Sequence, residues 1–294
     1  MAGEVRSVCP LDATLGEGPV WIDDALWCVD IKKRHVHRFD PARDQLQSWN
    51  APAQIGWVLP YAPGGLLAGL QTGLHRFDPD SGAFSLLVDP EPDLPGNRLN
   101  DACVDRHGRL WFGSMDDGES ALSGSIYRAD GRGIARVVSG IAITNGPAVS
   151  PDARRLYHVD TVEGIIFASD LDEQGELSAT REFARIPSEE GHPDGPTVDA
   201  EGCVWNGVFG GWGVRRYAPD GTLIETVRLP VSNVTKIAIG GPGLRTAITT
   251  TARHLLDDEQ CAEQHGAGNL FAFDAGVEGV PCPAVQPIGT NLLY

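Results

Sequence analysis

The chain of 294 residues carries a formal net charge of −17, from 40 acidic and 23 basic side chains. It lacks the clustered Lys and Arg that bind phosphate backbones or anionic membranes, so we expect neither nucleic acid nor a membrane as a partner. Its 36 Gly and 21 Pro residues interrupt the sequence too often for long helices, which favours an all-β fold.

Strand-like segments repeat along the chain. A short apolar run recurs six times, at residues 25–27, 65–67, 109–111, 155–157, 203–205 and, more weakly, 245–247. A second run follows each of them, at residues 36–40, 74–78, 126–130, 165–170, 214–217 and 270–274. A period of roughly 40 to 50 residues with room for four short strands is typical of propeller blades. The sequence therefore predicts a six-bladed β-propeller with four-stranded blades around a central channel.

The remaining segments agree with such a ring. We expect residues 5–9 to add a strand to the last blade, and residues 254–265 to form one or two helical turns inside a loop. No linker divides the chain, so we expect residues 1–294 to form a single domain. The first residues contain no apolar signal-peptide core, which predicts a cytoplasmic protein. We expect a monomer or a weak homo-oligomer.

Four turn-like segments place an oxygen-bearing side chain directly before a strand, at residues 17–20, 100–103, 145–148 and 194–197. In equivalent blades the leading residues occupy equivalent corners and converge on the axis: Glu17, Asn100, Asn145 and Asp194. Converging oxygen atoms are the ligands of hard divalent cations, so the repeat predicts a metal-centred site. His192 precedes the last of these segments, and it either lines the same mouth or lies exposed in a loop.

Other catalytic arrangements have little support. The six cysteines show no pair at the spacing of a thiolate zinc site, and we expect Cys28, Cys103 and Cys203 to be free thiols in strands. No serine lies in a nucleophile elbow. The glycine-rich segment 210–213 has no following Lys-Ser or Lys-Thr, so it does not form a phosphate-binding loop.

Several motifs in order resemble the SMP-30/gluconolactonase/regucalcin-like family over most of the chain. They are Leu-Gly-Glu-Gly-Pro-Val-Trp, Asn-Arg-Leu-Asn-Asp, Gly-Ser-Met, Gly-Ser-Ile-Tyr, Thr-Asn-Gly-Pro and Pro-Asp-Gly, at residues 15–21, 97–101, 113–115, 124–127, 144–147 and 193–195. Residues 212–217, 234–236 and 240–242 look most like the bacterial aldonolactonase branch, which includes xylono- and arabinonolactonases.

The resemblance implies a six-bladed propeller that hydrolyses a sugar lactone with one divalent metal ion. The family's Glu, Asn and Asp ligands carry over to Glu17, Asn145 and Asp194, and its substrate-binding residues to Arg98 and Asn100. The chain departs from the family pattern at residues 206–209, Ile143 and Ile237. These departures bear on which sugar fits rather than on the metal.

Lactone hydrolysis suits such a site chemically. A metal ion with open coordination positions can polarise the carbonyl and activate a water molecule, and Asp194 is our candidate for the general base. Arg98 can donate a forked pair of hydrogen bonds to the substrate. Asp117 and Glu119 lie in an acidic loop after Met115. They either close over the sugar hydroxyls or form a solvated charged surface.

Two alternatives to a sugar lactonase remain open at this point. One is a propeller of the same family with another ester or organophosphate as its substrate, and the other is a non-enzymic binding propeller. Two carboxylates and one amide suit Ca²⁺, Mg²⁺ or Mn²⁺, and Zn²⁺ or Fe²⁺ can occupy the same positions. The sequence predicts a divalent cofactor without naming the element, and a sugar lactone without naming its ring size.

Overall fold

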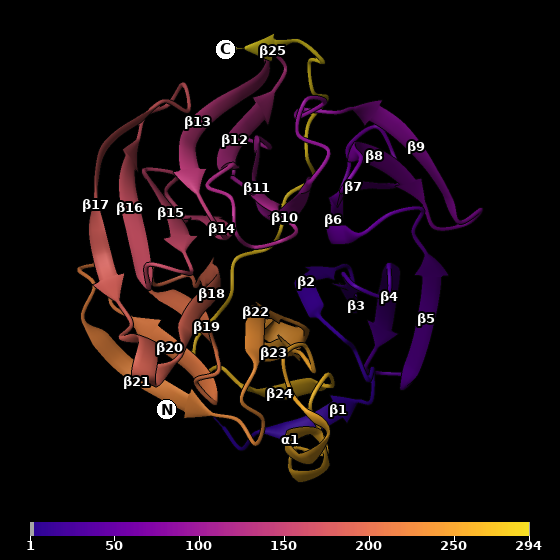
Figure 1. Cartoon of the computed structure of the whole chain (residues 1–294), viewed down its shortest axis with the longest axis vertical. Helices are drawn as coiled ribbons and strands as arrows, with labels where there is room; N and C mark the ends of the chain where they lie inside the picture. Colours follow the sequence, from indigo (N-terminus) through magenta and orange to yellow (C-terminus); the bar gives the residue numbers. More distant parts are fainter. Residues whose placement is uncertain (1–2, 294) are drawn as a thin grey trace.

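The structure is a computed structural model that describes residues 3–293. Its strands form six sheets arranged around one axis, and each sheet is a blade of the ring (Figure 1). The innermost strands of successive blades contact one another and return to the first: β2 (Gly16–Ile22), β6 (Ile55–Pro60), β10 (Asn97–Val104), β14 (Thr144–Val149), β18 (His192–Val198) and β22 (Val234–Gly240). The predicted six-bladed β-propeller is confirmed.

The outer strands follow in chain order within each blade. Blades 1 to 3 add β3 (Ala25–Asp30), β4 (His35–Asp40), β5 (Gln45–Asn50); β7 (Leu66–Leu70), β8 (Gly73–Asp78), β9 (Ala83–Val88); and β11 (Leu110–Asp116), β12 (Gly124–Asp130), β13 (Gly133–Ile141). Blades 4 to 6 add β15 (Arg155–Asp160), β16 (Ile165–Leu171), β17 (Leu177–Arg185); β19 (Val204–Phe209), β20 (Gly213–Tyr217), β21 (Leu223–Arg228); and β23 (Thr246–Thr251), β24 (Leu270–Asp274).

Blade 6 is completed by the start of the chain. Strand β1 (Arg6–Cys9) pairs antiparallel with β24, as the sequence predicts for residues 5–9. The predicted helical segment contains α1 (Asp258–Glu263), which the Asp257 side chain caps at its N-terminus. Two short 3₁₀ turns, Ser188–Glu190 and Pro242–Leu244, are the other helical elements of residues 3–293. No helix in this range is long and apolar enough to cross a membrane.

The core lies between the blades. The second strands are almost wholly buried, and their large side chains, among them Trp27, Trp111 and Trp205, pack against neighbouring sheets. Burying one such side chain stabilises the fold by about 1.5–3 kcal/mol. The fourth strands β5, β9 and β21 are mostly exposed. Burial therefore falls from the second strand toward the rim of each blade.

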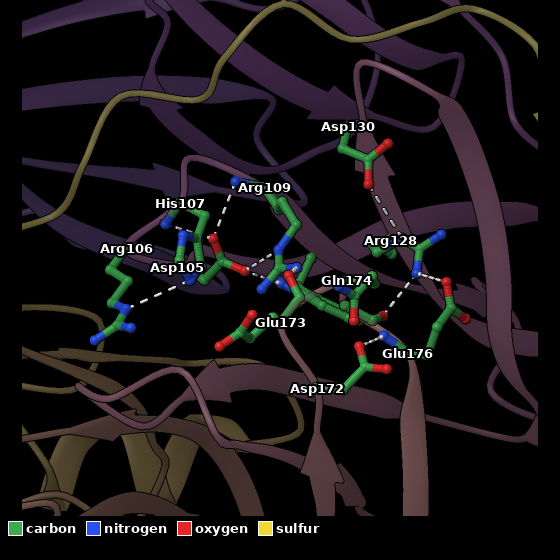
Figure 2. Close-up of polar contacts among 12 residues, drawn as sticks. Asp105, Arg106, His107, Arg109, Arg128, Asp130, Asp172, Glu173, Gln174 and Glu176 are labelled. Carbon is green, nitrogen blue, oxygen red and sulfur yellow. Dashed lines mark hydrogen bonds and ion pairs between the residues drawn. The ribbon is translucent and has the colours of Figure 1, made fainter.

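Polar contacts join neighbouring blades near the turn between β10 and β11, as Figure 2 shows for blades 3 and 4. The Asp105 carboxylate accepts hydrogen bonds from Arg109 Nε (2.6 Å) and Trp111 Nε1 (3.0 Å). Arg109 also donates to the Glu173 carbonyl of blade 4 (2.9 Å), and Arg128 donates to the Gly175 carbonyl (2.7 Å). These contacts hold the turn before β17 against blade 3.

Each innermost strand has an irregularity near its start. The pairing register with the second strand shifts between Glu17 and Val20 in blade 1, and at the corresponding point in each of the other five blades. A bulge of this kind redirects the side chains of the strand that carries it. The six bulges form a ring around one mouth of the propeller, and this ring carries the four corner residues.

The C-terminal segment ties blades together at the other mouth. We call residues 275–291 the strap; Figure 1 shows it passing from blade 6 across the centre of the ring to β25 (Leu292–Leu293), which pairs parallel with β13. Val285 of the strap exchanges backbone hydrogen bonds with Pro60 and Ala62, at the end of β6. The strap therefore lies at the opposite end of the inner strands from the bulges.

Candidate metal and substrate site

The corner residues meet in one small cavity at the bulged mouth. Glu17, Asn100, Asn145 and Asp194 all line it, and its volume is about 80 Å³. They come from four different blades, because the bulge of each inner strand turns the residue at the same level toward the axis. The convergence expected from the sequence repeat is thus present in the fold.

Hydrogen bonds fix the three predicted metal ligands. Glu17 Oε2 accepts from the Gly18 amide (2.7 Å), and Asn145 Nδ2 donates to Thr161 Oγ1 (2.9 Å). The Asp194 backbone carbonyl accepts from Asn206 Nδ2 (2.7 Å). Asn145 Oδ1 accepts one hydrogen bond from Asn100 Nδ2 (3.1 Å), and an amide oxygen has a second lone pair that a cation could use. Asn206, which the sequence marked only as a departure from the family pattern, therefore positions Asp194.

The two carboxylic acids are buried side by side. Burial, followed by the charge of Asp101, raises the pKa of Glu17 to about 7. Burial and then the charge of Glu17 raise the pKa of Asp194 well above its usual value. A cation between them would relieve both penalties, and carboxylate and amide oxygens are the donors that hard divalent ions prefer. Residues 3–293 contain no cluster of three His, Cys, Asp or Glu arranged for a metal. Asn145 and Asn100 are the amides that line the cavity beside Glu17 and Asp194.

The predicted substrate residues Arg98 and Asn100 also line the cavity. Arg98 Nη1 donates to Asn100 Oδ1 (2.5 Å), and Asn100 Nδ2 donates to the Thr144 carbonyl (2.6 Å) and to Asn145 Oδ1 (3.1 Å). Burial lowers the pKa of Arg98, although the Asp117 carboxylate opposes this shift. A chain of hydrogen bonds therefore links the predicted substrate residues to the predicted metal ligand Asn145.

Asp117 lies behind Arg98 and is not among the residues that line the cavity. Its carboxylate accepts hydrogen bonds from Arg98 Nε (2.9 Å), Lys32 Nζ (2.8 Å) and Gln54 Nε2 (2.7 Å). Burial opposes ionisation, but the hydrogen bonds from Lys32 and Gln54 and the Arg98 charge lower its pKa to about 2. With these partners, Asp117 orients Arg98.

Glu119 lines the cavity from the loop between β11 and β12. It faces His254, which lies between β23 and α1 in the opposite blade, with 3.9 Å between Glu119 Oε1 and His254 Nε2. His254 and its neighbour Leu255, also at the cavity, are residues that the sequence did not single out. Leu255 is exposed and has a φ of 65°, a left-handed conformation that costs a bulky side chain energy.

Apolar side chains form the other walls: Leu15, Ile31, Met115, Ile143 and Phe209. Of the departures from the family pattern, Ile143 and Phe209 reach the cavity, whereas Ile237 is not among the lining residues. His192 is also absent from the lining, and its Nδ1 lies 3.3 Å from the Thr161 carbonyl. All six cysteines are free.

A buried ion pair lies beneath the cavity. Lys236 Nζ from the bulge of blade 6 is 2.5 Å from Asp101 Oδ1 in the bulge of blade 3, the opposite blade. Asp101 Oδ2 accepts a hydrogen bond from the Gly146 amide (2.9 Å). The sequence repeat did not reveal this pair, because the corner of blade 6 carries Thr235 and Lys236 instead of an acid or amide.

The fold and this cavity define a six-bladed propeller with an oxygen-lined, acidic site in its mouth. Residues 15–253 match the family model described as SMP-30/gluconolactonase/LRE-like region. The chain therefore belongs to the SMP-30/gluconolactonase/regucalcin-like family, which the motifs resembled.

Individual relatives span nearly the whole chain. A 6-deoxy-6-sulfogluconolactonase of Pseudomonas putida is 32% identical, over 95% of this chain and 97% of its own. An L-arabinolactonase of Azospirillum brasilense is 36% identical, over 92% of this chain and 91% of its own. A crystal structure of the calcium-binding protein regucalcin from Agrobacterium tumefaciens superposes with a TM-score of 0.92 at 28% identity, covering 97% of this chain and 98% of that one.

Proposed function

We propose that this protein is a divalent-metal-dependent lactonase that opens a sugar lactone to the aldonic acid. The observation that carries the proposal is the pairing of two buried, pKa-raised carboxylic acids with an amide oxygen, directly beside Arg98 and Asn100. Similarity to curated sugar lactonases over more than nine-tenths of the chain supports the substrate class.

Glu17, Asn145 and Asp194 would hold the metal ion, which polarises the lactone carbonyl and makes water more acidic when bound. Asp194 then takes a proton from the attacking water as general base. The water oxygen bonds to the carbonyl carbon, the ring C–O bond breaks, and the proton returns to the departing ring oxygen, so that atoms and charge balance. No serine or cysteine is acylated in this sequence of steps.

Arg98 and Asn100 would bind the sugar beside the reacting carbonyl. Arg98 is held by Asp117 on one edge and Asn100 on the other, so its guanidinium is oriented before the substrate arrives. Preorganised donors of this kind stabilise developing negative charge without reorganisation during the reaction. Glu119 can accept hydrogen bonds from sugar hydroxyls at the rim, and the apolar walls face the carbon skeleton.

A panel of sugar lactones tests the proposal. Acid release would be measured for pentonolactones and hexonolactones, with an aryl ester and an organophosphate as competing substrates. We expect the protein to hydrolyse at least one sugar lactone. A chelator should abolish this hydrolysis, and adding a divalent ion should restore it. Faster turnover of the organophosphate would favour the alternative activity. Metal-independent hydrolysis, or an acyl-enzyme trapped on a Ser or Cys and detected by mass spectrometry, would contradict the mechanism.

A further inference from the structure

Asp101 and Lys236 form a buried ion pair that the proposed reaction does not use. The two side chains are 1% and 7% exposed. An ion pair without solvent is costly to bury, so its presence under a functional cavity calls for a physical role. Neither residue lines the small cavity; Lys236 instead lines a larger one, of about 550 Å³, that opens toward the strap. The pair therefore separates the two cavities.

The pair touches the backbone next to two of the proposed metal ligands. Asp101 accepts from the amide of Gly146, which follows Asn145. The Lys236 side chain passes over Gly195, which follows Asp194, so closely that a Cβ on Gly195 would lie 2.6 Å from Lys236 Cγ. Glycine at this position is thus required by the path of the lysine. The pair spans blades 3 to 6 directly beneath the carboxylates.

The charges of the pair act in opposite directions on the site above them. The Asp101 carboxylate repels the ionised form of Glu17, whereas the Lys236 ammonium stabilises it. A divalent cation in the cavity carries the opposite charge to ionised Glu17. Asp101 would therefore attract the cation, and Lys236 would repel it. In a buried site such interactions are screened little by solvent.

We propose that Asp101 and Lys236 are positioning residues whose opposed charges set the metal affinity of the site. The inference rests on the proposed function, because it needs a metal ion in the cavity. Each charge offsets most of the other's effect, so the intact pair contributes little net field while the separate residues contribute strongly. The ion pair holds the affinity between two extremes, tight binding without Lys236 and weak binding without Asp101.

Single substitutions separate the two charges. Lys236→Met keeps most of the side-chain volume and removes the positive charge, and Asp101→Asn keeps the shape and removes the negative one. We expect Asp101→Asn to weaken metal binding and Lys236→Met to strengthen it, each by about tenfold, which corresponds to roughly 1.4 kcal/mol. The double variant should return to within about threefold of the wild type, because removing both charges removes two opposite effects on metal affinity that cancel.

Binding of Ca²⁺ and of Mn²⁺ to the metal-free full-length protein would be measured by calorimetry, at about pH 8.5 to limit competition from protons. The control is Arg109→Met, which breaks the buried Asp105–Arg109 pair at the far end of β10. It should lower the melting temperature and leave metal affinity unchanged. If Lys236→Met does not fold, the metal affinities of Asp101→Asn and of the double variant can still be compared with that of the wild type.

Opposite signs for the two single variants would support the proposal, since mere distortion of the site would weaken binding in both. Weakening in both, or a change below about twofold in both, would overturn it. Failure of the wild-type protein to bind any divalent ion would instead refute the proposed function itself, and these two results are distinguishable in the same experiment.

Discussion

Glu17 and Asp194, the two acids that we propose as metal ligands, show how such residues can work against the stability of the fold that holds them. Both acids are buried next to one another, and their raised pKa values report the cost of ionising them there. Replacing either by its amide removes a ligand charge and also removes that cost. Function and stability should therefore respond in opposite directions at these two residues.

For Glu17→Gln and Asp194→Asn we expect a loss of lactone hydrolysis of at least about 100-fold, because an amide ligand binds the cation more weakly and cannot act as a base. The metal-free variants should be more stable than metal-free wild type by about 1–2 kcal/mol. Urea unfolding and a lactone assay on the same samples measure both effects. Activity near the wild-type level would exclude these residues from the site.

Protons should compete with the metal ion at Glu17. Its pKa of about 7 means that the free acid is protonated below neutrality, and a ligand must lose its proton to bind metal. We expect apparent metal affinity to fall as the pH drops below about 7, by up to about tenfold per pH unit. The Glu17→Gln variant should lose much of this dependence. An affinity that is flat from neutral to mildly acidic pH would contradict the assignment.

Arg98 should affect the substrate more than the metal. Arg98→Lys keeps the charge but loses the forked contact with Asp117 and Asn100, so we expect kcat/KM to fall by about tenfold or more while bound metal stays unchanged. Lys32→Met is the matched control, since Lys32 contacts the same Asp117 carboxylate without lining the cavity. Elemental analysis alongside kinetics checks this. Loss of metal in Arg98→Lys would assign Arg98 to the metal shell.

At the scale of elements, the inner strands show what a repeat can and cannot reveal. Corner residues that share a chemical type, such as Asn145 and Asp194, were predictable because each precedes its strand in the same way. Thr235 occupies the equivalent corner of blade 6, and Lys236 follows it; the chemistry of Lys236 differs from that of the corner residues, and its partner lies 135 residues away in the sequence. The role of Asp117 also depended on contacts with Lys32 and Gln54 from other blades, which local sequence does not encode.

Strand β15 contains a buried histidine, His158, that should make the fold sensitive to acid. Its Nδ1 has no hydrogen-bond partner, its ring stacks on Phe167, and burial lowers its pKa to about 4. The unfolded chain takes up a proton near pH 6.5 and the folded chain does not until about pH 4. Stability is therefore full above the higher value and declines as pH falls between the two, by up to about 1.4 kcal/mol per unit.

We expect His158→Phe to remove this histidine's share of the decline, leaving that of His37, whose pKa burial also lowers to about 4. Unfolding free energies at neutral and mildly acidic pH measure it, with the exposed His107→Gln as control. An unchanged pH slope in His158→Phe would show that His158 is protonated in the native state.

At the scale of the whole molecule, the strap acts as a second closure of the ring. Val285 of the strap is fully buried where it pairs with Tyr61 at the end of β6, whereas Val280 in the same segment is 41% exposed. We expect Val285→Asp to lower the melting temperature by at least about 5 °C and Val280→Asp to change it little. Metal affinity should be unaffected in both, because the strap lies at the opposite mouth. Equal melting temperatures in the two variants would show that the strap does not support the ring.

The overall ring was predictable from the sequence, but the strap was not. Six copies of a strand pattern determine the number of blades, and closing the ring led us to expect that residues 5–9 join the last blade. Residues 275–291 contain no such periodicity, and their hydrogen bonds go to Pro60, Gly108 and Asp130, which are distant in sequence. Long-range pairing of an irregular segment leaves no local signature.

The pairing of β1 with β24 also has a consequence for how the chain is made. A ribosome synthesises β1 first, but its partner emerges only after five complete blades have left the tunnel. During this interval β1 has no sheet to join, and once β24 appears, blade 6 presents an open edge until the two meet. Exposed strand edges pair readily with other chains. The nascent protein is therefore most vulnerable to aggregation at the end of translation, when β1, the first strand to be synthesised, still has to pair with β24 to close the ring.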